Sequence, residues 1–348
     1  MQWYFQANKA GYLHPQKMSN KLRYYLTPKL RFRQFCDLKE ALGKNSGDSV
    51  DFNIVTNVTS GANVMGIREK DNMPETGFRV KQGSVCVVEF GNSIPFTGKS
   101  KVLSKWDVEN IIRKLLARDA ANTIDSRIEL EFDNTLMRYV GTGAAAGMMF
   151  RNGYAGIANS TGMYPYHVKE IIDDLRTREV PTYDDEDYVC LATTFALRNL
   201  KDELEKVGMY TESGRKPILA GEVGRYYGCR FVEVNHGMSA ENFDIGKSSE
   251  AYFFGSDTVI EAIAIPEEVR VKEPSDYQRK QGLAWYGIFG YKLQWGDRRV
   301  ATDDWHESRI IKWDSADGTN SSSASTYSRS YNSWASASES LGWCISPA

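Results

Sequence analysis

Two β-prone segments separated by a long polar stretch place the strongest constraint on what this chain can fold into. Residues 51–58 alternate apolar and polar side chains, and residues 84–90 are rich in valine, so each segment predicts a strand. Residues 60–83 between them are mostly polar and contain several glycines. A two-stranded hairpin is only marginally stable by itself in water. We therefore expect this hairpin to lie against another chain.

Residues 105–132 predict one long helix, with Ser104 as the N-cap and Asp107 three residues later as its capping-box partner. Four apolar side chains share one face of this helix: Val108, Ile111, Ile112 and Leu115. Ile124 and Ile128 fall on the opposite side, so the helix either changes neighbours along its length or bends. At ~1.5 Å per residue it spans roughly 42 Å. A compact core cannot enclose that length, so we expect a spine helix running along a lobe.

The rest of the chain alternates between short helices and strands. The predicted helices are residues 166–178 and 197–207, and the predicted strands lie in residues 187–197, 229–234, 252–265, 283–293 and 309–313. Pro266 is expected to stop the strand before it. Residues 141–163 are rich in glycine and alanine and predict a loop or hinge. The fold class is therefore α+β.

The two ends of the chain differ from its middle. The first 34 residues are aromatic and basic and are interrupted by Pro15 and Pro28, which predicts an extended arm. Its most basic part, residues 21–33, is either a solvated arm or a DNA contact. The last 33 residues are Ser-rich, and Tyr and Trp side chains among them are candidate anchors on a neighbouring surface.

Composition narrows the class of protein further. The chain has 348 residues and a formal net charge of −2 at pH 7, which does not fit a protein built to grip nucleic acid. Its five cysteines are odd in number and far apart, without a CxxC motif, so we expect no disulfide framework and no zinc site. No signal peptide and no apolar run near ~18 residues is present, so we expect a protein made in the cytoplasm, with no membrane contact.

No residue set predicts catalysis, a cofactor or a metal. The glycines at 141, 143 and 147 match a dinucleotide fingerprint only loosely, because no amphipathic helix follows directly. Residues 98–100 end like a phosphate loop, but Ser93 stands where the first glycine belongs. The four histidines form no metal-binding spacing, and the acidic runs 184–187 and 303–307 are expected to be solvated turns.

The order of these parts resembles a known family. An N-terminal arm, a long hairpin, a spine helix, a mixed α/β lobe and terminal strands resemble the major capsid proteins of tailed phages with the Hong Kong 97 fold, over residues 30–315. Five phrases resemble the branch of N-four-like podophages in particular. They are Pro95-Phe-Thr-Gly-Lys-Ser-Lys, Ile111-Ile-Arg-Lys-Leu-Leu-Ala-Arg, Gly221-Glu-Val-Gly-Arg-Tyr-Tyr-Gly-Cys-Arg-Phe-Val-Glu, Arg279-Lys-Gln-Gly-Leu-Ala-Trp-Tyr-Gly-Ile-Phe-Gly-Tyr and Arg309-Ile-Ile-Lys-Trp.

The resemblance implies a division of the chain into functional parts. Residues 1–44 would be the N-terminal arm, and residues 45–100 the extended hairpin loop that overlies a neighbouring subunit. Residues 101–164 and 266–315 would form the peripheral domain around the spine helix. Residues 165–265 would form the axial domain at the capsomer centre. The Ser-rich tail, residues 316–348, departs from the family pattern, and we expect a decoration or a clasp.

The resemblance also implies function and partners. The chain would be a non-enzymatic subunit that assembles into hexamers and pentamers of an icosahedral virion shell around double-stranded DNA, without sequence-specific binding. Portal and scaffolding proteins, and a possible cement protein, would be its partners. The candidate inter-subunit residues are Arg68, Glu69, Lys70, Arg79, Trp334 and Trp343. Lys70 and Lys81 are the hairpin lysines available for the covalent crosslink of one subfamily, but no partner asparagine or catalytic glutamate can be matched.

Two other classes of protein stay open at this stage. One is another shell or tail protein, such as a tail tube or a nanocompartment. The other is an α/β nucleotide-binding enzyme that uses the loop at residues 141–147.

Overall fold

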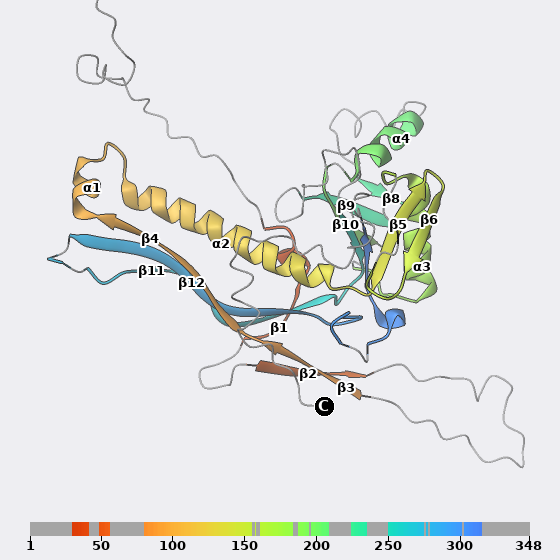
Figure 1. Cartoon of the computed structure of the whole chain (residues 1–348), viewed down its shortest axis with the longest axis horizontal. Coiled ribbons are helices and arrows are strands. Elements are labelled where there is room, and N and C mark those ends of the chain that lie inside the picture. The colour runs from red at the N-terminus through yellow and green to blue at the C-terminus, as the bar shows by residue number, and fades with distance from the viewer. Residues whose placement is uncertain are drawn as a thin grey trace, which may run out of the picture.

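The computed structural model describes an elongated lobe and a compact lobe joined by one long helix (Figure 1). The described residues are 30–41, 49–55, 80–154, 157, 161–183, 187–194, 196–208, 224–234, 250–274, 276–277, 279–300 and 303–314. The helices are α1 (Gly98–Leu103), α2 (Val108–Asp133), α3 (Pro165–Thr177) and α4 (Arg198–Gly208), with two short 3-10 turns, η2 (Arg33–Phe35) and η5 (Trp305–Glu307).

The strands form three sheets. The elongated lobe has a four-stranded sheet in the order β1 (Asp37–Ala41), β11 (Val259–Val271), β12 (Lys280–Leu293) and β4 (Val88–Thr97). The compact lobe has a seven-stranded sheet in the order β6 (Ala146–Phe150), β5 (Met137–Gly143), β13 (Ile310–Trp313), β10 (Ala251–Phe254), β7 (Tyr188–Ala192), β9 (Cys229–Glu233) and β8 (Arg225–Tyr226). The third sheet is a hairpin of β2 (Ser49–Val55) and β3 (Val80–Cys86).

The helix α2 lies along one face of the four-stranded sheet, and the β2–β3 hairpin lies on the other face (Figure 1). Its buried apolar side chains recur every fourth residue: Ile112, Leu116, Ala120, Ile124, Ile128 and Phe132. Each step of four residues advances about 40° around a helix, so this stripe winds round α2. The helix therefore changes neighbours without bending. Leu115 was expected on the buried face, but it is 42% exposed.

The start of α2 corrects the predicted cap. The carboxylate of Asp107 accepts hydrogen bonds from the backbone amides of Glu109 and Asn110, so Asp107 is the N-cap. Ser104 instead ends the separate helix α1, which Thr97 caps. A carboxylate at this position also interacts favourably with the positive end of the helix dipole, which explains why Asp107 serves better than the serine.

The C-terminal end of α2 packs against the compact lobe and so joins the two lobes. Phe132 is fully buried, and its ring lies 5.1 Å from that of Phe254 and 5.8 Å from that of Tyr252, both on β10 of the compact lobe. Phe32, from the end of the predicted arm, packs edge-on against the same Phe132 ring at 5.6 Å. Burying each such aromatic side chain stabilises the fold by about 1.5–3 kcal/mol. The lobes therefore share one core.

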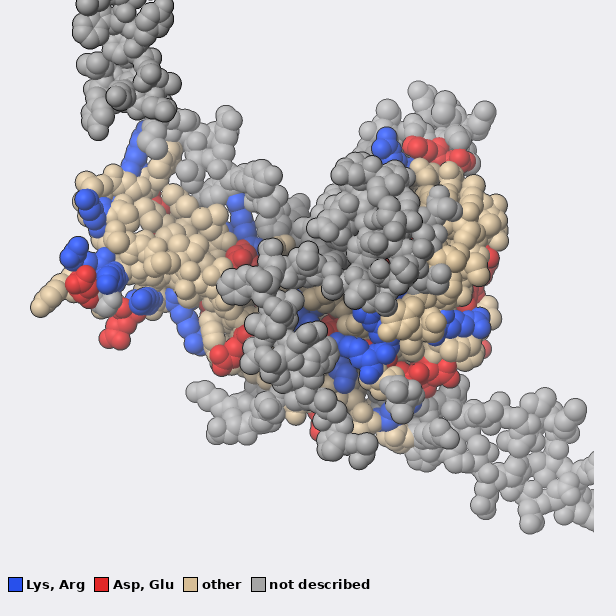
Figure 2. Space-filling model, viewed as in Figure 1, with Lys and Arg blue, Asp and Glu red and all other residues tan. Residues whose placement is uncertain are grey.

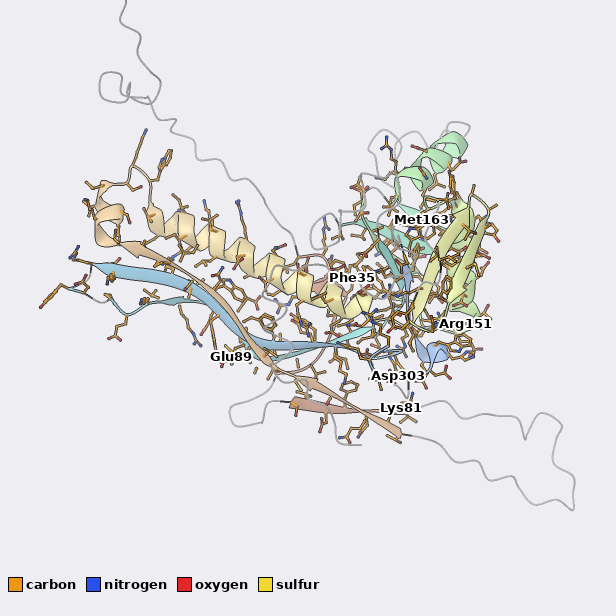
Figure 3. All side chains as sticks on the ribbon, viewed as in Figure 1. Phe35, Lys81, Glu89, Arg151, Met163 and Asp303 are labelled. Atoms are coloured by element: carbon orange, nitrogen blue, oxygen red, sulfur yellow. The ribbon has the colours of Figure 1, made fainter. Side chains whose placement is uncertain are left out.

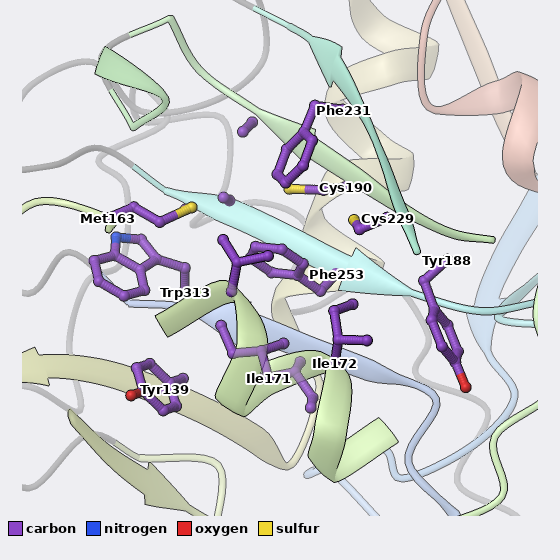
Figure 4. Packing of buried hydrophobic residues seen from close by; sticks show 14 of the residues in the cluster. Tyr139, Met163, Ile171, Ile172, Tyr188, Cys190, Cys229, Phe231, Phe253 and Trp313 are labelled. Carbon is purple, nitrogen blue, oxygen red and sulfur yellow. The ribbon is translucent and has the colours of Figure 1, made fainter. Parts of the chain in front are cut away.

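A second core fills the compact lobe between its sheet and the helices α3 and α4 (Figure 4). Ile171, Ile172 and Leu175 of α3 are fully buried against it, at the spacing of one helical face. Pro165 at the first helical position suits the start of α3, because the amide that it lacks would be unpaired there. The predicted helices 166–178 and 197–207 are thus confirmed to within a residue or two.

Two predicted boundaries are wrong. Part of the expected loop at residues 141–163 is a β-hairpin, because β5 and β6 pair antiparallel with Gly141 opposite Gly147. Pro266 does not end a strand but lies inside β11, where the pairing with β12 is irregular between Ile265 and Glu268. A proline is tolerated at such a bulge, since its missing amide has no ladder partner to lose.

The cysteines differ in part from expectation. Cys36, Cys190 and Cys229 carry free thiols. Cys86 is disulfide-bonded, a bond that the expectation of no disulfide framework did not include.

Candidate assembly surfaces

The β2–β3 hairpin sits tightly on its own subunit at its base. Val50 and Val85 face inward and pack on Ile260 and Ala262 of β11. A Cβ atom at Gly290 of β12 would lie 2.2 Å from the carbonyl oxygen of Cys86. The hairpin backbone therefore approaches the sheet more closely than any side chain at position 290 would allow. This contact fixes where the hairpin leaves the body.

An ion pair holds the next part of the hairpin. The Nζ atom of Lys81 lies 2.7 Å from Oε2 of Glu307, the last residue of η5, and 3.7 Å from Oδ1 of Asp303, two residues before η5. Figure 3 labels Lys81 and Asp303. Burial raises the pKa of Asp303, although a backbone hydrogen bond from Asp297 and the charge of Lys81 oppose the shift. A partly exposed pair of this kind contributes only about 0–1 kcal/mol. The ion pair of Lys81 therefore fixes the orientation of the hairpin and contributes little to the stability of the fold.

The outer face of the hairpin is polar near the body and apolar further out. Asp51, Asn53 and Gln82 are exposed, and the next outward pair is Val55 opposite Val80, both also exposed. A cross-strand pair of β-branched side chains normally packs against a neighbour. Here it faces away from the subunit's own sheet, so the hairpin offers an apolar contact just before residues 56–79 begin.

The inter-subunit candidates chosen from the sequence are not placed by the structure. Arg68, Glu69, Lys70 and Arg79 fall in residues 56–79, and Trp334 and Trp343 fall in residues 315–348, all outside the described residues. They stay predictions. Lys81, the second crosslinking candidate, is described and is paired with Glu307 of its own subunit.

The distal tip, residues 98–105 and 269–280, is the surface that the sequence did not point to. Gly98 donates to the carbonyl of Arg279, which holds α1 beside the turn between β11 and β12. Leu103 is 72% exposed and Val271 is 68% exposed. Val271 pairs with Leu283, which is buried under α2, so it belongs to the apolar face of the sheet at a place where the helix no longer covers it.

The turn at this tip presents an aromatic side chain to its surroundings. Tyr277 is 99% exposed, and both it and Asp276 have positive φ angles, at 51° and 55°. Left-handed backbone costs a non-glycine residue roughly 1–2 kcal/mol. Tyrosine is enriched at the centres of protein interfaces. An aromatic side chain among charged neighbours in residues 267–280 was the available signal, and no element was predicted for these residues.

His167 and the glycines at 141–147, which were considered above for metal or cofactor binding, have structural roles in the compact lobe. Nδ1 of His167 accepts the amide proton of Tyr164, and Nε2 lies 2.8 Å from the carbonyl oxygen of Gly143, to which it can only donate. Burial lowers the pKa of His167, so the ring is neutral and ties α3 to the β5–β6 hairpin. The glycines at 141–147 are part of that hairpin, not of a phosphate loop before a helix.

In the part of the chain that the structure describes, no group of three or more His, Cys, Asp or Glu side chains is placed to hold a metal ion. None of the described helices is both long and apolar enough to cross a membrane.

Comparison with known proteins identifies the fold. The head protein of Helicobacter pylori bacteriophage KHP40 superimposes with a TM-score of 0.66 at 12% identity, over 91% of this chain and 99% of that chain. The capsid of Helicobacter pylori bacteriophage KHP30 gives 0.64 at 12% identity over 90% and 98%. A chain of Mycobacterium phage Che8 gives 0.61 at 13% identity over 87% and 97%. No model of a known protein family and no curated protein sequence matches.

The likeness covers nearly the whole of each chain. The chain therefore has the phage capsid fold of the Hong Kong 97 type, and the predicted fold class is confirmed.

Proposed function

We propose that this protein is the major capsid protein of a tailed phage, a subunit that assembles into the icosahedral shell around double-stranded DNA. The observation that carries the proposal is the distal tip together with the hairpin. Both project from the body and both expose apolar side chains, Val271 and Tyr277 on one and Val55 on the other. Exposed apolar patches on projecting elements mark contacts with other chains.

The proposed assembly follows from the same surfaces. Hexamers and pentamers form by a heterologous contact that closes into rings, and the hairpin and tail tie neighbouring rings together. The division into arm, hairpin loop, peripheral domain, axial domain and tail at residues 44, 100, 164, 265 and 315 is part of the proposal. Portal and scaffolding proteins complete the shell, with or without a cement protein, and the subunit is made in the host cytoplasm.

Two further points belong to the proposal, one from the sequence and one from the structure. The phrases quoted above support a place in the branch of N-four-like podophages. Among the described residues, His167 and Tyr139 take part in contacts that join α3 to the β5–β6 hairpin: Tyr139 donates to Glu170, and His167 donates to the carbonyl of Gly143. A mechanical role as a shell subunit fits this arrangement.

Deletion of residues 60–78 tests the role of the hairpin. The deletion leaves β2 and β3 intact, together with the Lys81 ion pair, so the subunit should fold and stay soluble. It should fail to form closed shells, because the part of the hairpin that reaches a neighbour is gone. Negative-stain electron microscopy and thermal unfolding of the purified protein measure the two outcomes separately.

A matched variant separates length from chemistry. Replacing residues 60–78 by a Gly-Ser segment of the same length keeps the reach but removes the side chains. If this variant assembles, reach alone suffices; if it does not, the side chains of the hairpin make the contact. Normal closed particles from the deletion variant would contradict the proposed role of the hairpin, and tubes in place of shells from the wild type would contradict the proposed function.

A further inference from the structure

The described residues contain four of the five cysteines of the chain, and three of these four carry free thiols held inside the fold. Cys36 packs against the core that the lobes share, with its Sγ atom 3.7 Å from the carbonyl oxygen of Phe32. Cys190 on β7 and Cys229 on β9 are fully buried in the compact lobe and share a hydrogen bond (Figure 4). Burial raises the pKa of the thiols of Cys36 and Cys190, which disfavours the reactive thiolate form.

The fourth described cysteine, Cys86, is disulfide-bonded. The structure consists of a single chain, so the second sulfur of this bond belongs to another cysteine of the same chain. The three free thiols are excluded, which leaves Cys344 as the candidate. Cys344 belongs to the Ser-rich tail, outside the described residues.

Cys86 lies at the base of the β2–β3 hairpin, opposite Ser49 of β2. Side chains alternate along a strand, and the preceding Val85 faces inward onto β11. The Cys86 side chain therefore points to the outer side of the hairpin, where it is half-buried. The backbone of Cys86 is fixed by its close approach to Gly290. The hairpin base thus offers a rigid attachment point for a segment that crosses this side.

The Ser-rich tail has little charge with which to bind the rest of the subunit. Its charged residues are Asp317, Arg329 and Glu339. Figure 2 shows basic and acidic side chains interspersed over the described residues on the face in view. Isolated ion pairs at such a surface contribute little to binding. Ionic contacts would hold this tail weakly, so a firm attachment needs another kind of bond.

The length of the tail allows a bond to the hairpin base. Asp314 is the last described residue, and Cys344 comes 30 residues later. An extended chain spans at most about 3.3–3.6 Å per residue, so this segment reaches roughly 100 Å. The 26 residues of α2 span only about 39 Å, so the tail is long enough to cross the subunit. Three apolar residues flank Cys344 in the otherwise Ser-rich segment, which favours its contact with a surface: Leu341, Trp343 and Ile345.

We propose that Cys344 is joined to Cys86 within the subunit and that this disulfide clasps the Ser-rich tail to the base of the hairpin after cell lysis. The time at which the bond forms rests on the proposed function, because a phage particle assembles in a reducing cytoplasm and leaves it at lysis. The bond itself does not rest on that function. As it forms, the two thiols lose two protons and two electrons, and a small-molecule disulfide such as oxidised glutathione accepts them and becomes two thiols. The tail is then held at the element that is proposed to reach a neighbouring subunit.

Peptide mapping of the full-length protein tests the bond. Trypsin places Cys86 in peptide 82–99 and Cys344 in peptide 330–348. After incubation with oxidised glutathione, and without reduction, the two peptides should appear as one cross-linked mass that separates on reduction. Cys344→Ser should abolish this mass, whereas Cys36→Ser, the matched control, should retain it. Separate, alkylated peptides 82–99 and 330–348 from the oxidised wild type would overturn the proposal.

Counting the thiols shows which chain supplies the partner and when the bond forms. Alkylation of the denatured, oxidised wild type should label three thiols, and five after reduction. On a non-reducing gel the oxidised protein should run as a monomer, and dimers that Cys344→Ser removes would place the bond between subunits and overturn the clasp. Cells opened in denaturant with N-ethylmaleimide should yield five labelled thiols, and a count of three would overturn the proposed timing. Circular dichroism melting confirms that each variant is folded.

Electron microscopy of the same preparations separates the bond from the proposed function. If the wild type forms closed shells but never yields the cross-linked mass, the clasp is absent and the capsid role stands. If it yields the cross-linked mass but forms no shells under any condition, the capsid role and the proposed timing fail and the bond stands.

Discussion

At the scale of single residues, the packing of the compact lobe depends on a glycine that faces a tyrosine. A Cβ atom at Gly147 would lie 1.9 Å from the hydroxyl oxygen of Tyr139. That ring cannot move away, since it is fully buried beside Trp313 and His167 and its hydroxyl donates to Glu170. Burial, and then the bond to Glu170, raise the pKa of Tyr139, so the hydroxyl keeps its proton.

Gly147→Ala should therefore destabilise the protein by about 1–3 kcal/mol, the usual cost of overpacking a core. Gly143→Ala is the matched control in the same hairpin, because its Cβ would meet only Ala146, at 3.6 Å, which is ordinary contact. Chemical denaturation of both variants measures the difference. Equal stability of the two variants would show that the Tyr139 ring relaxes freely.

At the scale of elements, the end of α2 is held by an ion-pair cluster as well as by its core. The carboxylate of Asp133 contacts Lys312 of β13 and Arg138 of β5, and Lys312 also lies 2.9 Å from Glu250. Burial by itself would raise the pKa of Asp133, but the charges of Lys312 and Arg138 outweigh it, so the pKa lies well below its usual value. The cluster joins the spine helix to the central strands of the compact lobe.

A carboxyl group whose pKa is lowered by folding stabilises the protein above its unfolded pKa and loses that contribution as the pH falls towards the folded value. Asp133→Asn should thus lower the free energy of unfolding at pH 7 by about 2–4 kcal/mol, since it leaves Lys312 and Arg138 short of a partner. The difference from wild type should narrow as the pH drops below about 4. Asp51→Asn, on the exposed face of the hairpin, is the control and should leave the free energy of unfolding at pH 7 close to that of wild type.

The elements that the sequence predicted best were the helices with a regular apolar pattern. The helices α3 and α4 follow an unbroken apolar period, so their bounds could be predicted. The winding stripe of α2 could not, because it follows the neighbours of the helix and not one straight face. The strand through Pro266 contains a proline and an irregular register with β12, and the hairpin at residues 141–150 is rich in glycine and alanine, so neither shows the apolar alternation that predicts a strand.

At the scale of the whole molecule, the sequence predicted projecting parts but not the exposed apolar side chains of the distal tip. Projecting parts could be recognised because a long polar hairpin and a helix of this length cannot fit inside one compact core. The distal tip could not, because Val269 and Val271 have the pattern of an ordinary buried strand. Only the length of α2 relative to the sheet decides that these side chains are left uncovered.

The distal tip should therefore control assembly without affecting the fold. Leu103→Ser together with Val271→Ser should leave the free energy of unfolding within about 0.5 kcal/mol of wild type, as for other exposed positions. The protein concentration needed for shell formation should rise about tenfold or more, which corresponds to ~1.4 kcal/mol per subunit. Light scattering against concentration measures this threshold, and Leu115→Ser on the α2 side is the control, expected to leave it unchanged. Unaltered assembly of the tip variant would mean that the neighbour of this surface lies elsewhere and that another part of the subunit closes the shell.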